Sequence, residues 1–411
     1  MQEPLVSPFP LHNAQLQPVK RDRISAQRVA FLFPSLELGD YWHPVFQRFT
    51  QVCPKLTIYT SLWQGYAPGF EDSFKLKLVG KYKTINWDQS SEVYQKYVAI
   101  VPLSIVKDLV RDRPQVIFTS AYSIWTLLIS LLKPIFRWKI IVLYDGWSPT
   151  YDYSDSPIRL LTRRWMTKMA DACVTNSPAG QRYLVETLRA KASQVLLRPY
   201  QVPDPQALLG NQDKAGSLPT VPIQDRPIRF LFVGRVTSRK GIKPLIQACA
   251  KLQEAGIENF QVTVIGDGDQ RSQLQALTNG GALRDRVEWL GRIPYNQLGQ
   301  YFQSTDVFLF PTLEDIWGMV LLEAMVFRKP VICSELAGAA ESMVIENENG
   351  FMIDPRNVND IAEKMRKFIE QPDRIAAMGQ AAYDTVAQYT PETATQFLLN
   401  TMEKVTTNSR I

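Results

Sequence analysis

The feature that most limits the fold is an alternation of short apolar runs with longer helix-like stretches. It occurs twice, on both sides of a segment at 202–226 that is rich in Pro, Gly, Asp, Asn and Gln and has no sustained period. Such alternation is typical of parallel sheets whose strands are joined by helices. A chain of 411 residues is also too long for one hydrophobic core, so we expect two domains.

The expected elements follow this rhythm. Before the segment, we expect strands at 28–33, 55–59, 115–118, 139–144 and 172–175, and helices at 91–110, 122–132, 157–169 and 178–189. After it, we expect strands at 228–233, 262–265, 287–290, 307–310 and 330–333, and helices at 241–255, 270–277, 295–303, 319–326, 358–371, 374–388 and 391–405.

These elements predict an α/β chain of two Rossmann-like, doubly wound domains. The division is a flexible tail at 1–27, an N-terminal domain at 28–201, a linker at 202–227, a C-terminal domain at 228–388, and a helix at 389–411 expected to pack back on the N-terminal domain. Ligands of such sheets bind at the carboxyl ends of the strands. We therefore expect a site in the cleft between the two domains.

The composition excludes several classes of site and protein. Only two histidines and four widely spaced cysteines are present, so a His-based metal site, a Ser-His-Asp relay or a disulfide framework is not expected. The first residues lack a secretory signal, and the most apolar run, 123–136, is too short to span a bilayer. These features predict a cytoplasmic protein with no metal and no cofactor.

Positive charge is concentrated in the first half of the chain. Residues 101–170 hold ten Lys or Arg against five Asp, interleaved with tryptophans. This pattern suits an anionic membrane surface or an anionic acceptor, although an ordinary solvated basic face is equally compatible with it. No nucleic-acid module accompanies the charge, so nucleic-acid binding is not expected.

The first chemically informative segment is 233–241, which reads VGRVTSRKG between an expected strand and an expected helix. Gly234 permits close backbone approach, the planar guanidinium of Arg235 can hold two phosphate oxygens, and Lys240 adds a charge beside the helix N-terminus. Gly241 ends the segment. These groups could bind a diphosphate, but a solvated basic turn would have the same composition.

The second segment is 310–325, which reads FPTLEDIWGMVLLEAM. Asp315 lies in a loop, and Glu323 lies about one turn into the next helix, so both carboxylates can face the strand ends. A carboxylate that accepts bonds from two hydroxyls can clamp a ribose. Backbone amides near Trp317 and Gly318 can bind oxygens at the helix N-terminus. Taken separately, both acids are also common helix-start residues.

Together these residues resemble the family-4 retaining glycosyltransferases, also called glycosyl transferases group 1, which have the GT-B fold. The resemblance covers roughly 228–390. Besides the two segments, it includes the Gly266-Asp267-Gly268 turn, Leu290-Gly291, Pro330, Gly338, Glu341 and Asn349-Gly350.

The resemblance implies a role for each matching residue. In the family, the residues matching Arg235 and Lys240 hold the donor diphosphate, the residue matching Glu323 binds the ribose, and the first acid contacts the transferred sugar. The residues near Arg292 and Ile293 would flank the nucleobase.

This chain departs from the family pattern, because Asp315 replaces the first Glu of the Glu-x7-Glu signature. We interpret the shorter acid as a change of specificity. Gly39 stands alone where a glycine pair often lies near the donor phosphates, and the usual N-domain histidine is missing. Asp145, or else His43, is the candidate for orienting an acceptor hydroxyl, although a turn residue and a packed histidine are the simpler interpretations.

We therefore expect a retaining, metal-independent hexosyltransferase. A peripheral location on the cytoplasmic face of the membrane is compatible with this expectation. It would move a sugar from a nucleoside diphosphate donor to a glycan or lipid-linked acceptor in envelope polysaccharide or glycolipid synthesis. A non-catalytic nucleotide-sugar-binding module and a GT-B sugar-nucleotide epimerase remain alternatives. A nicotinamide dehydrogenase is not expected, because no Gly-x-Gly-x-x-Gly follows the first strand.

Overall fold

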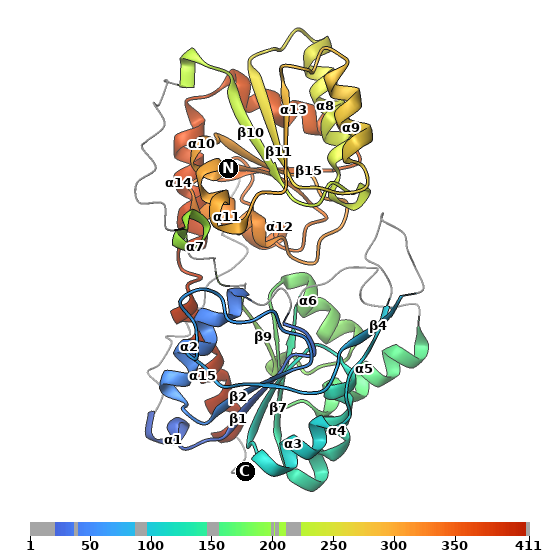
Figure 1. Ribbon diagram of the computed structural model, residues 1–411, viewed down its shortest axis with the longest axis vertical. Helices are drawn as coiled ribbons and strands as arrows, with labels where there is room; N and C mark the ends of the chain where they lie inside the picture. Colours follow the sequence, from blue (N-terminus) through green and yellow to red (C-terminus); the bar gives the residue numbers. More distant parts are fainter. Residues whose placement is uncertain are drawn as a thin grey trace, which may run out of the picture. The chain divides into compact units, whose positions relative to one another are not determined.

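The chain folds into two compact units in a computed structural model that describes residues 21–36, 40–86, 97–145, 156–198, 201, 205–210 and 223–407 (Figure 1). The first unit contains the described residues up to 201 together with 389–407. The second contains the described residues from 205 to 388. The C-terminal segment thus belongs to the same unit as the N-terminal sheet.

The first unit is built on a seven-stranded parallel sheet with the order β3-β2-β1-β6-β7-β8-β9. Its strands are β1 (Val29–Leu32), β2 (Leu56–Thr60), β3 (Leu76–Leu78), β6 (Val116–Ser120), β7 (Lys139–Tyr144), β8 (Ala172–Thr175) and β9 (Val195–Leu197). A separate antiparallel pair is formed by β4 (Lys83–Asn86) and β5 (Tyr97–Ile100). The parallel sheet confirms the α/β class expected from the alternation.

Successive side chains of each strand enter different cores, because strand side chains alternate between the two faces of a sheet. Phe31 packs in a cluster with residues of α2 (His43–Val52) and α15 (Pro391–Thr407). Its neighbours Ala30 and Leu32 pack with residues of α3 (Ile105–Asp112) and α4 (Ile124–Phe136). The remaining helices are α1 (Arg21–Ser25), α5 (Pro157–Met169) and α6 (Pro178–Arg182), which continues as a π-helical turn at Tyr183–Thr187.

One predicted helix of this unit is wrong in part. The sequence predicts a helix over 91–110, but Tyr97–Ile100 forms β5 and the helix α3 begins only at Ile105. The run 97–100 contains the strand formers Tyr, Val and Ile, and Pro102 lacks the backbone N–H that a helix interior needs. Residues 91–96 lie outside the described part of the chain.

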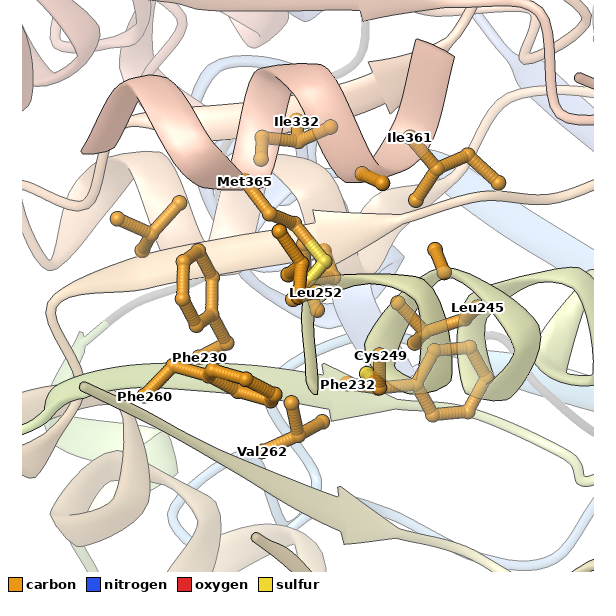
Figure 2. Packing of buried hydrophobic residues seen from close by; sticks show 14 of the residues in the cluster. Phe230, Phe232, Leu245, Cys249, Leu252, Phe260, Val262, Ile332, Ile361 and Met365 are labelled. Atoms are coloured by element: carbon orange, nitrogen blue, oxygen red, sulfur yellow. The ribbon is translucent and has the colours of Figure 1, made fainter. Parts of the chain in front are cut away.

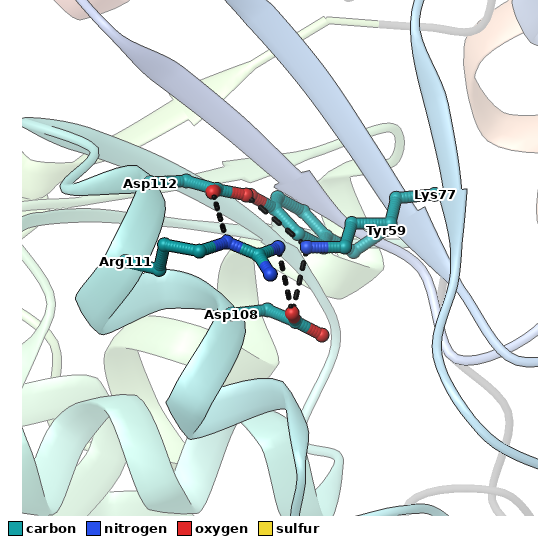
Figure 3. Close-up of polar contacts among 5 residues, drawn as sticks. All are labelled: Tyr59, Lys77, Asp108, Arg111 and Asp112. Carbon is teal, nitrogen blue, oxygen red and sulfur yellow. Dashed lines mark hydrogen bonds and ion pairs between the residues drawn. The ribbon is translucent and has the colours of Figure 1, made fainter.

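A polar cluster joins β2, β3 and α3 in this unit (Figure 3). The Tyr59 hydroxyl donates to Asp112 Oδ2 over 2.6 Å, and Lys77 Nζ lies 2.6 Å from Asp108 Oδ1. Arg111 contacts both carboxylates of its own helix. Burial, followed by the nearby Asp112, raises the pKa of Tyr59, so its phenol stays protonated and keeps this hydrogen bond.

The second unit contains a six-stranded parallel sheet with the order β12-β11-β10-β13-β14-β15. Its strands are β10 (Ile228–Val233), β11 (Phe260–Ile265), β12 (Val287–Gly291), β13 (Val307–Phe310), β14 (Val331–Ser334) and β15 (Gly350–Ile353). Its helices are α7 (Pro205–Leu209), α8 (Ile242–Glu254), α9 (Arg271–Asn279), α10 (Leu298–Ser304), α11 (Met319–Val326), α12 (Ala340–Met343), α13 (Val358–Glu370) and α14 (Arg374–Val386).

The main core of this unit lies between the sheet and the helices α8 and α13. Phe230 and Phe260 on neighbouring strands meet Leu252 of α8 and Met365 of α13 (Figure 2). Burying one such side chain contributes about 1.5–3 kcal/mol. On the opposite face, the Phe302 ring of α10 packs at a tilt against the Phe308 ring of β13, with ring centroids 5.9 Å apart. The core therefore holds the strands of this sheet in place, and with them the loops at their carboxyl ends.

The predicted linker contains structure that its composition did not indicate. Residues 205–209 form α7, and a short 3-10 turn covers Ile223–Asp225. The helix α7 packs closely on α10 because Gly299 has no side chain, and a Cβ there would lie 2.9 Å from the carbonyl oxygen of Leu208. Within the described ranges, no helix is both long and apolar enough to cross a bilayer.

Candidate functional site

The candidate site is formed by the loops that follow β10, β11, β13 and β14 in the second unit. Because these strands are parallel, their carboxyl ends share one edge of the sheet. Both informative sequence segments, 233–241 and 310–325, begin at this edge. The pairing of β10 with β13 thus brings together two segments that lie about 70 residues apart.

The first two loops touch through their backbones. Val236 N–H donates to Asp267 O over 3.0 Å, and Gly234 N–H donates to Ile265 O over 2.9 Å. A Cβ on Gly266 would overlap the carbonyl oxygen of Gly234, and Gly266 also has a φ of +136°. Glycine is therefore required in this turn to let the two loops meet.

The loop after β10 also meets the loop after β13. Gly241 has a φ of +68° and precedes α8, and a Cβ at this position would overlap the carbonyl oxygen of Pro311. The Arg239 carbonyl oxygen accepts from Leu313 N–H over 2.8 Å and from Thr312 Oγ1 over 3.1 Å. These bonds hold the basic turn against the acidic loop.

The contact between the two loops ends in an ion pair. Lys240 Nζ pairs with Asp315 Oδ2 and lies 5.4 Å from the centroid of the Phe310 ring. Arg239 Nη1 donates to Glu314 O over 2.7 Å and lies 3.9 Å from the same Asp315 oxygen. Lys240, Arg239 and Asp315 are all largely buried, whereas Arg235 is exposed.

Arg239 is a site residue that sequence reasoning missed. It lies inside the 233–241 segment, beside the two cations that the resemblance identified. The residues around Arg239 in the sequence do not show whether its side chain is solvated or donates a hydrogen bond to a carbonyl oxygen of another loop. Only the contact with Glu314, 75 residues later, reveals its position.

The start of α11 is held by the same acid. Trp317 N–H donates to Asp315 Oδ1 over 3.3 Å, and Gly338 N–H donates to Asp315 O over 2.9 Å. Gly318, which has a φ of +100°, lies against the Phe310 ring, where a Cβ would overlap ring carbons. The backbone N–H groups at the start of α11 are thus fixed close to the basic turn.

Glu323 lies on α11 and is 7% exposed. Tyr295 donates from its hydroxyl to Glu323 Oε1 over 3.2 Å. Burial raises the pKa of Glu323 to about 7, partly offset by this hydrogen bond. A carboxyl group that titrates near neutrality can change its protonation when a ligand brings hydroxyl groups to it. Tyr295 was missed by sequence reasoning, because an exposed tyrosine carries no signal for such a bond.

The remaining residues predicted to bind the donor lie at the carboxyl end of β12. Arg292 and Ile293 directly follow β12, and Arg292 is exposed while Ile293 is half-buried. Arg271 approaches this turn closely, because a Cβ on Gly291 would lie 2.9 Å from Arg271 Nη1. Their contact with a nucleobase stays a prediction.

The predicted acceptor residues lie in the first unit. Asp145 directly follows β7 and lines a pocket there. His43 is fully buried among Tyr66, Phe70 and Phe74, and its Nδ1 accepts from Ala67 N–H over 3.0 Å. This environment is that of a core histidine, so the geometry gives no support to a ligand contact. Gly39 lies outside the described residues.

The second unit combines groups that can bind an anion with carboxylates that can accept hydrogen bonds from hydroxyl groups. Lys240 and the first N–H groups of α8 and α11 attract negative charge, while Asp315 and Glu323 accept hydrogen bonds from hydroxyl groups. Among the residues that the structure describes, no group of three or more His, Cys, Asp or Glu side chains is arranged to hold a metal ion.

Comparisons with known proteins agree with this geometry. Residues 217–385 match the sequence model of the family described as Glycosyl transferases group 1. An uncharacterised glycosyltransferase of Methanocaldococcus jannaschii is 34% identical over 152 residues, which are 37% of this chain and 38% of the relative. The sulfoquinovosyl transferase of Arabidopsis thaliana is 24% identical over 327 residues, which are 75% of this chain and 60% of the relative. The chain spans less than two thirds of the length of these relatives.

Solved structures share the fold. The crystal structure of HepE from Anabaena in complex with UDP aligns with a TM-score of 0.68 and 16% identity, over 92% of this chain and 100% of that chain. At this level of identity the likeness concerns the fold alone. The predicted GT-B class, with two parallel α/β sheets, is confirmed.

Proposed function

We propose that this chain is a retaining glycosyltransferase with a nucleoside diphosphate sugar as its donor, because residues 217–385 match the glycosyl transferases group 1 family. The observation that carries the proposal is the buried pairing of Lys240 with Asp315 at the start of α8 and α11. It places a cation, two helix N-termini and a carboxylate at one strand edge. A diphosphate with an attached sugar could bind all four groups, with the phosphates at the cation and the helix N-termini and a sugar hydroxyl at the carboxylate.

The leaving diphosphate develops negative charge as the bond to the anomeric carbon breaks. Preorganised positive groups at that point are the largest contribution that a protein can make to such a step. Lys240 is held for this role by Asp315, and Arg235 is exposed and can turn toward the second phosphate. The departing phosphate oxygen would take the proton of the acceptor hydroxyl, so no separate base is needed.

Asp315 would contact the transferred sugar once the diphosphate engages Lys240. Its backbone is fixed by Gly338, and its Oδ1 accepts from Trp317 N–H, so the carboxylate has a defined position. An aspartate at this position reaches less far than a glutamate. We therefore propose that this residue sets donor specificity among hexoses.

The function is tested by incubating the protein with UDP-, GDP- and ADP-hexoses and following nucleoside diphosphate release, with and without EDTA. We expect release from one class of donor, unaffected by the chelator, because Lys240 and Arg235 supply the positive charge. Release that stops in EDTA and returns with Mg²⁺ would contradict metal independence. No release and no donor binding would favour the non-catalytic alternative.

Donor affinity is expected to fall as the pH decreases through 7. Glu323 has a raised pKa of about 7, so it is protonated below this pH and must lose its proton before it can accept bonds from two ribose hydroxyls. Each pH unit below 7 should weaken binding about tenfold. Calorimetry with the active donor between pH 6 and 8 measures the dissociation constant at each pH.

The matched variants for that experiment are Glu323→Gln and Glu254→Gln. Glu254 is exposed at the end of α8, so its variant should keep the wild-type pH profile. Glu323→Gln should bind about 10–100-fold more weakly at pH 8 and show a flat profile, because its amide replaces charge-assisted hydrogen bonds. A wild-type profile that is already flat would remove Glu323 from the donor site.

We further propose that the acceptor lies on an anionic membrane surface. The helices α4 and α5 contact each other and carry Lys and Arg but no Asp or Glu. Ile135 of α4 and Ile158 of α5 are 71% and 76% exposed. Exposed apolar side chains with basic residues around them suit the boundary between lipid headgroups and acyl chains.

Sedimentation with vesicles of phosphatidylserine and phosphatidylcholine tests this surface. The wild type should bind at low salt and be released by high salt, since basic side chains supply part of the attraction. Ile135→Asp combined with Ile158→Asp should abolish binding, whereas Leu277→Asp, at a 63% exposed position on α9, should not. Equal binding by all variants, or no wild-type binding, would refute the proposal.

A further inference from the structure

A cavity of about 410 Å³ lies within the second unit, at the amino ends of β13 and β14. Thr305 and Asp306 lie just before β13, and Arg328 and Lys329 lie just before β14. The start of α14 and the 3-10 turn at Ile223–Asp225 form the other walls. Because the candidate donor site lies at the carboxyl ends of these parallel strands, the cavity is on the opposite edge of the sheet.

Lys329 is the residue of this cavity that most needs an explanation. Its Nζ donates to Thr305 O over 2.7 Å and to Gln303 O over 3.2 Å, and among the described residues no carboxylate forms an ion pair with it. An ammonium group has three donors, so one N–H is left over. Burial lowers the pKa of Lys329, and the nearby Asp306 offsets this only in part. An anion would supply both the third acceptor and the missing negative charge.

Other partly buried lysines of this chain have a carboxylate partner. Lys133 Nζ lies 2.6 Å from Asp171 Oδ2, and Lys240 pairs with Asp315. Such pairing is expected, because a charge that is largely removed from water is costly unless an opposite charge lies beside it. Lys329 differs from these lysines in having only neutral carbonyl partners.

The acid that lines the cavity beside Lys329 already has partners. Arg226 Nη1 donates to Asp306 Oδ2 over 2.6 Å, and Arg226 Nη2 donates to Asp306 Oδ1 over 2.8 Å. Arg229 N–H also donates to Asp306 Oδ2, over 2.8 Å. A bidentate pair of this kind holds the carboxylate in place. Asp306 and Arg226 therefore neutralise each other, and the charge of Lys329 remains.

Arg328 adds a second cation to the same wall. It is exposed, its guanidinium lies 4.2 Å from the centroid of the Tyr383 ring, and its Nε donates to Gln380 Oε1 over 3.0 Å. Its Nη1 and Nη2 groups have no hydrogen-bond partner in the described ranges. Ala376, in the first turn of α14, also lines the cavity, and N–H groups of a first helical turn lack intrahelical acceptors and attract negative charge. Two cations and a helix start thus share one cavity.

The mixture of groups indicates the chemical class of the ligand. The cations and the helix start suit a phosphate group, whereas the carboxylate of Asp373 and the amide of Gln224, both exposed, suit hydroxyl groups. The volume lies within the range of small-molecule pockets and leaves room for more than a phosphate ion. None of the described residues that line the cavity is aromatic, so it offers no ring on which a nucleobase could stack.

We propose that this cavity binds a small phosphate ester that carries hydroxyl groups, with its phosphate at Lys329 and Arg328. The site is separate from the donor site, because Arg328 lies two residues past the end of α11 and Asp315 lies before its start. The helix has 8 residues and is therefore about 12 Å long. Binding at this edge needs none of the residues assigned to the donor, so the proposal does not depend on the transferase function.

Methyl NMR of the full chain, labelled at the isoleucine δ1-methyl groups, tests the cavity directly. Ile223 and Ile375 line it, whereas Ile293 follows β12 at the opposite edge of the sheet. We expect at least one of glycerol 3-phosphate, ribose 5-phosphate and glucose 6-phosphate to shift the signals of Ile223 and Ile375 with saturation. Inorganic phosphate should bind at least about tenfold more weakly, because it has no hydroxyl groups for the other walls.

Three outcomes of this titration would overturn the proposal. The first is no shift with any of the three esters. The second is a shift of Ile293 without Ile223 and Ile375, which would place the ester at the donor edge of the sheet. The third is equal affinity for inorganic phosphate and the esters, which would leave an anion site without selectivity for an ester.

Charge reversal at Arg328 provides the matched variants. Arg328→Glu should weaken ester binding at least about tenfold, because charge-assisted hydrogen bonds are lost and a like charge is added. Arg284 is exposed near the amino end of β12, on the same edge of the sheet, and does not line the cavity. Arg284→Glu makes the same change of net charge and should bind like the wild type. Equal weakening by both variants would show that net charge alone decides binding and would refute the proposal.

Two lysine variants locate the phosphate. Lys329→Met should weaken ester binding at least about tenfold, and it should also lower the melting temperature, since Gln303 O and Thr305 O lose their donor. Lys240→Ala should bind the ester with wild-type affinity, because Lys240 lies at the opposite edge of the sheet. Undiminished binding by Lys329→Met, or loss of binding in Lys240→Ala, would contradict the assignment of the phosphate to this cavity.

Discussion

Lys240→Ala is expected to release nucleoside diphosphate at least about 100-fold more slowly than the wild type. Loss of one preorganised donor to a developing negative charge typically lowers kcat by about 10²–10³. Lys240 is largely buried against Asp315 and the Phe310 ring, where water screens its charge less than at the surface. The expected loss therefore lies in kcat more than in donor affinity.

The matched control is Lys243→Ala. Lys243 lies in the first turn of α8, three residues after Lys240, and is exposed, so its variant should release nucleoside diphosphate at nearly the wild-type rate. Because Lys240→Ala leaves Asp315 with only the more distant Arg239 as a cation, Lys240→Arg serves as a second variant that retains the charge. The arginine should recover part of the rate. A rate for Lys240→Ala within threefold of the wild type would contradict the assignment of Lys240 to the leaving diphosphate.

Gly241→Ala is expected to lower the free energy of unfolding by about 3 kcal/mol or more. A residue other than glycine at a φ of +68° costs about 1–2 kcal/mol. The added Cβ would also overlap the carbonyl oxygen of Pro311, so the two loops would have to separate. The cost of strained backbone then adds to that of the lost loop contacts.

Gly256→Ala separates these two causes. Gly256 has a φ of +74° but no atom within 4 Å of an added Cβ, so only the backbone cost of about 1–2 kcal/mol should appear. Urea denaturation followed by circular dichroism measures both variants. Gly241→Ala should also slow nucleoside diphosphate release, since the displaced loop carries Lys240, whereas Gly256→Ala should not. Equal destabilisation by the two variants would mean that the contact with Pro311 contributes nothing.

Several elements could be predicted from the sequence because their signals are local. The strands at 139–144, 228–233 and 307–310 and the helices at 157–169 and 319–326 have the predicted bounds. Each strand is marked by a short, mostly apolar run, and the two helices begin at Pro157 and directly after Gly318. The strand missed at 350–353 follows directly after the turn at 347–349 and has no flanking pattern long enough to reveal it.

The partners of the site residues could not be predicted in this way. Arg239 bonds a carbonyl 75 residues later, and Tyr295 bonds Glu323 on another element. The burial of His43 among three aromatic rings likewise depends on which segments pack together. No local period contains that information.

The sequence by itself determined the rhythm of strands and helices, the parallel sheets, and the strand ends at which Lys240, Asp315 and Asp145 appear. These follow from side-chain periodicity and from the glycines that allow tight loops. Only the tertiary structure decided the order of the strands and the pairing of Lys240 with Asp315. These contacts join residues far apart in the chain, and their geometry is set by how whole elements pack.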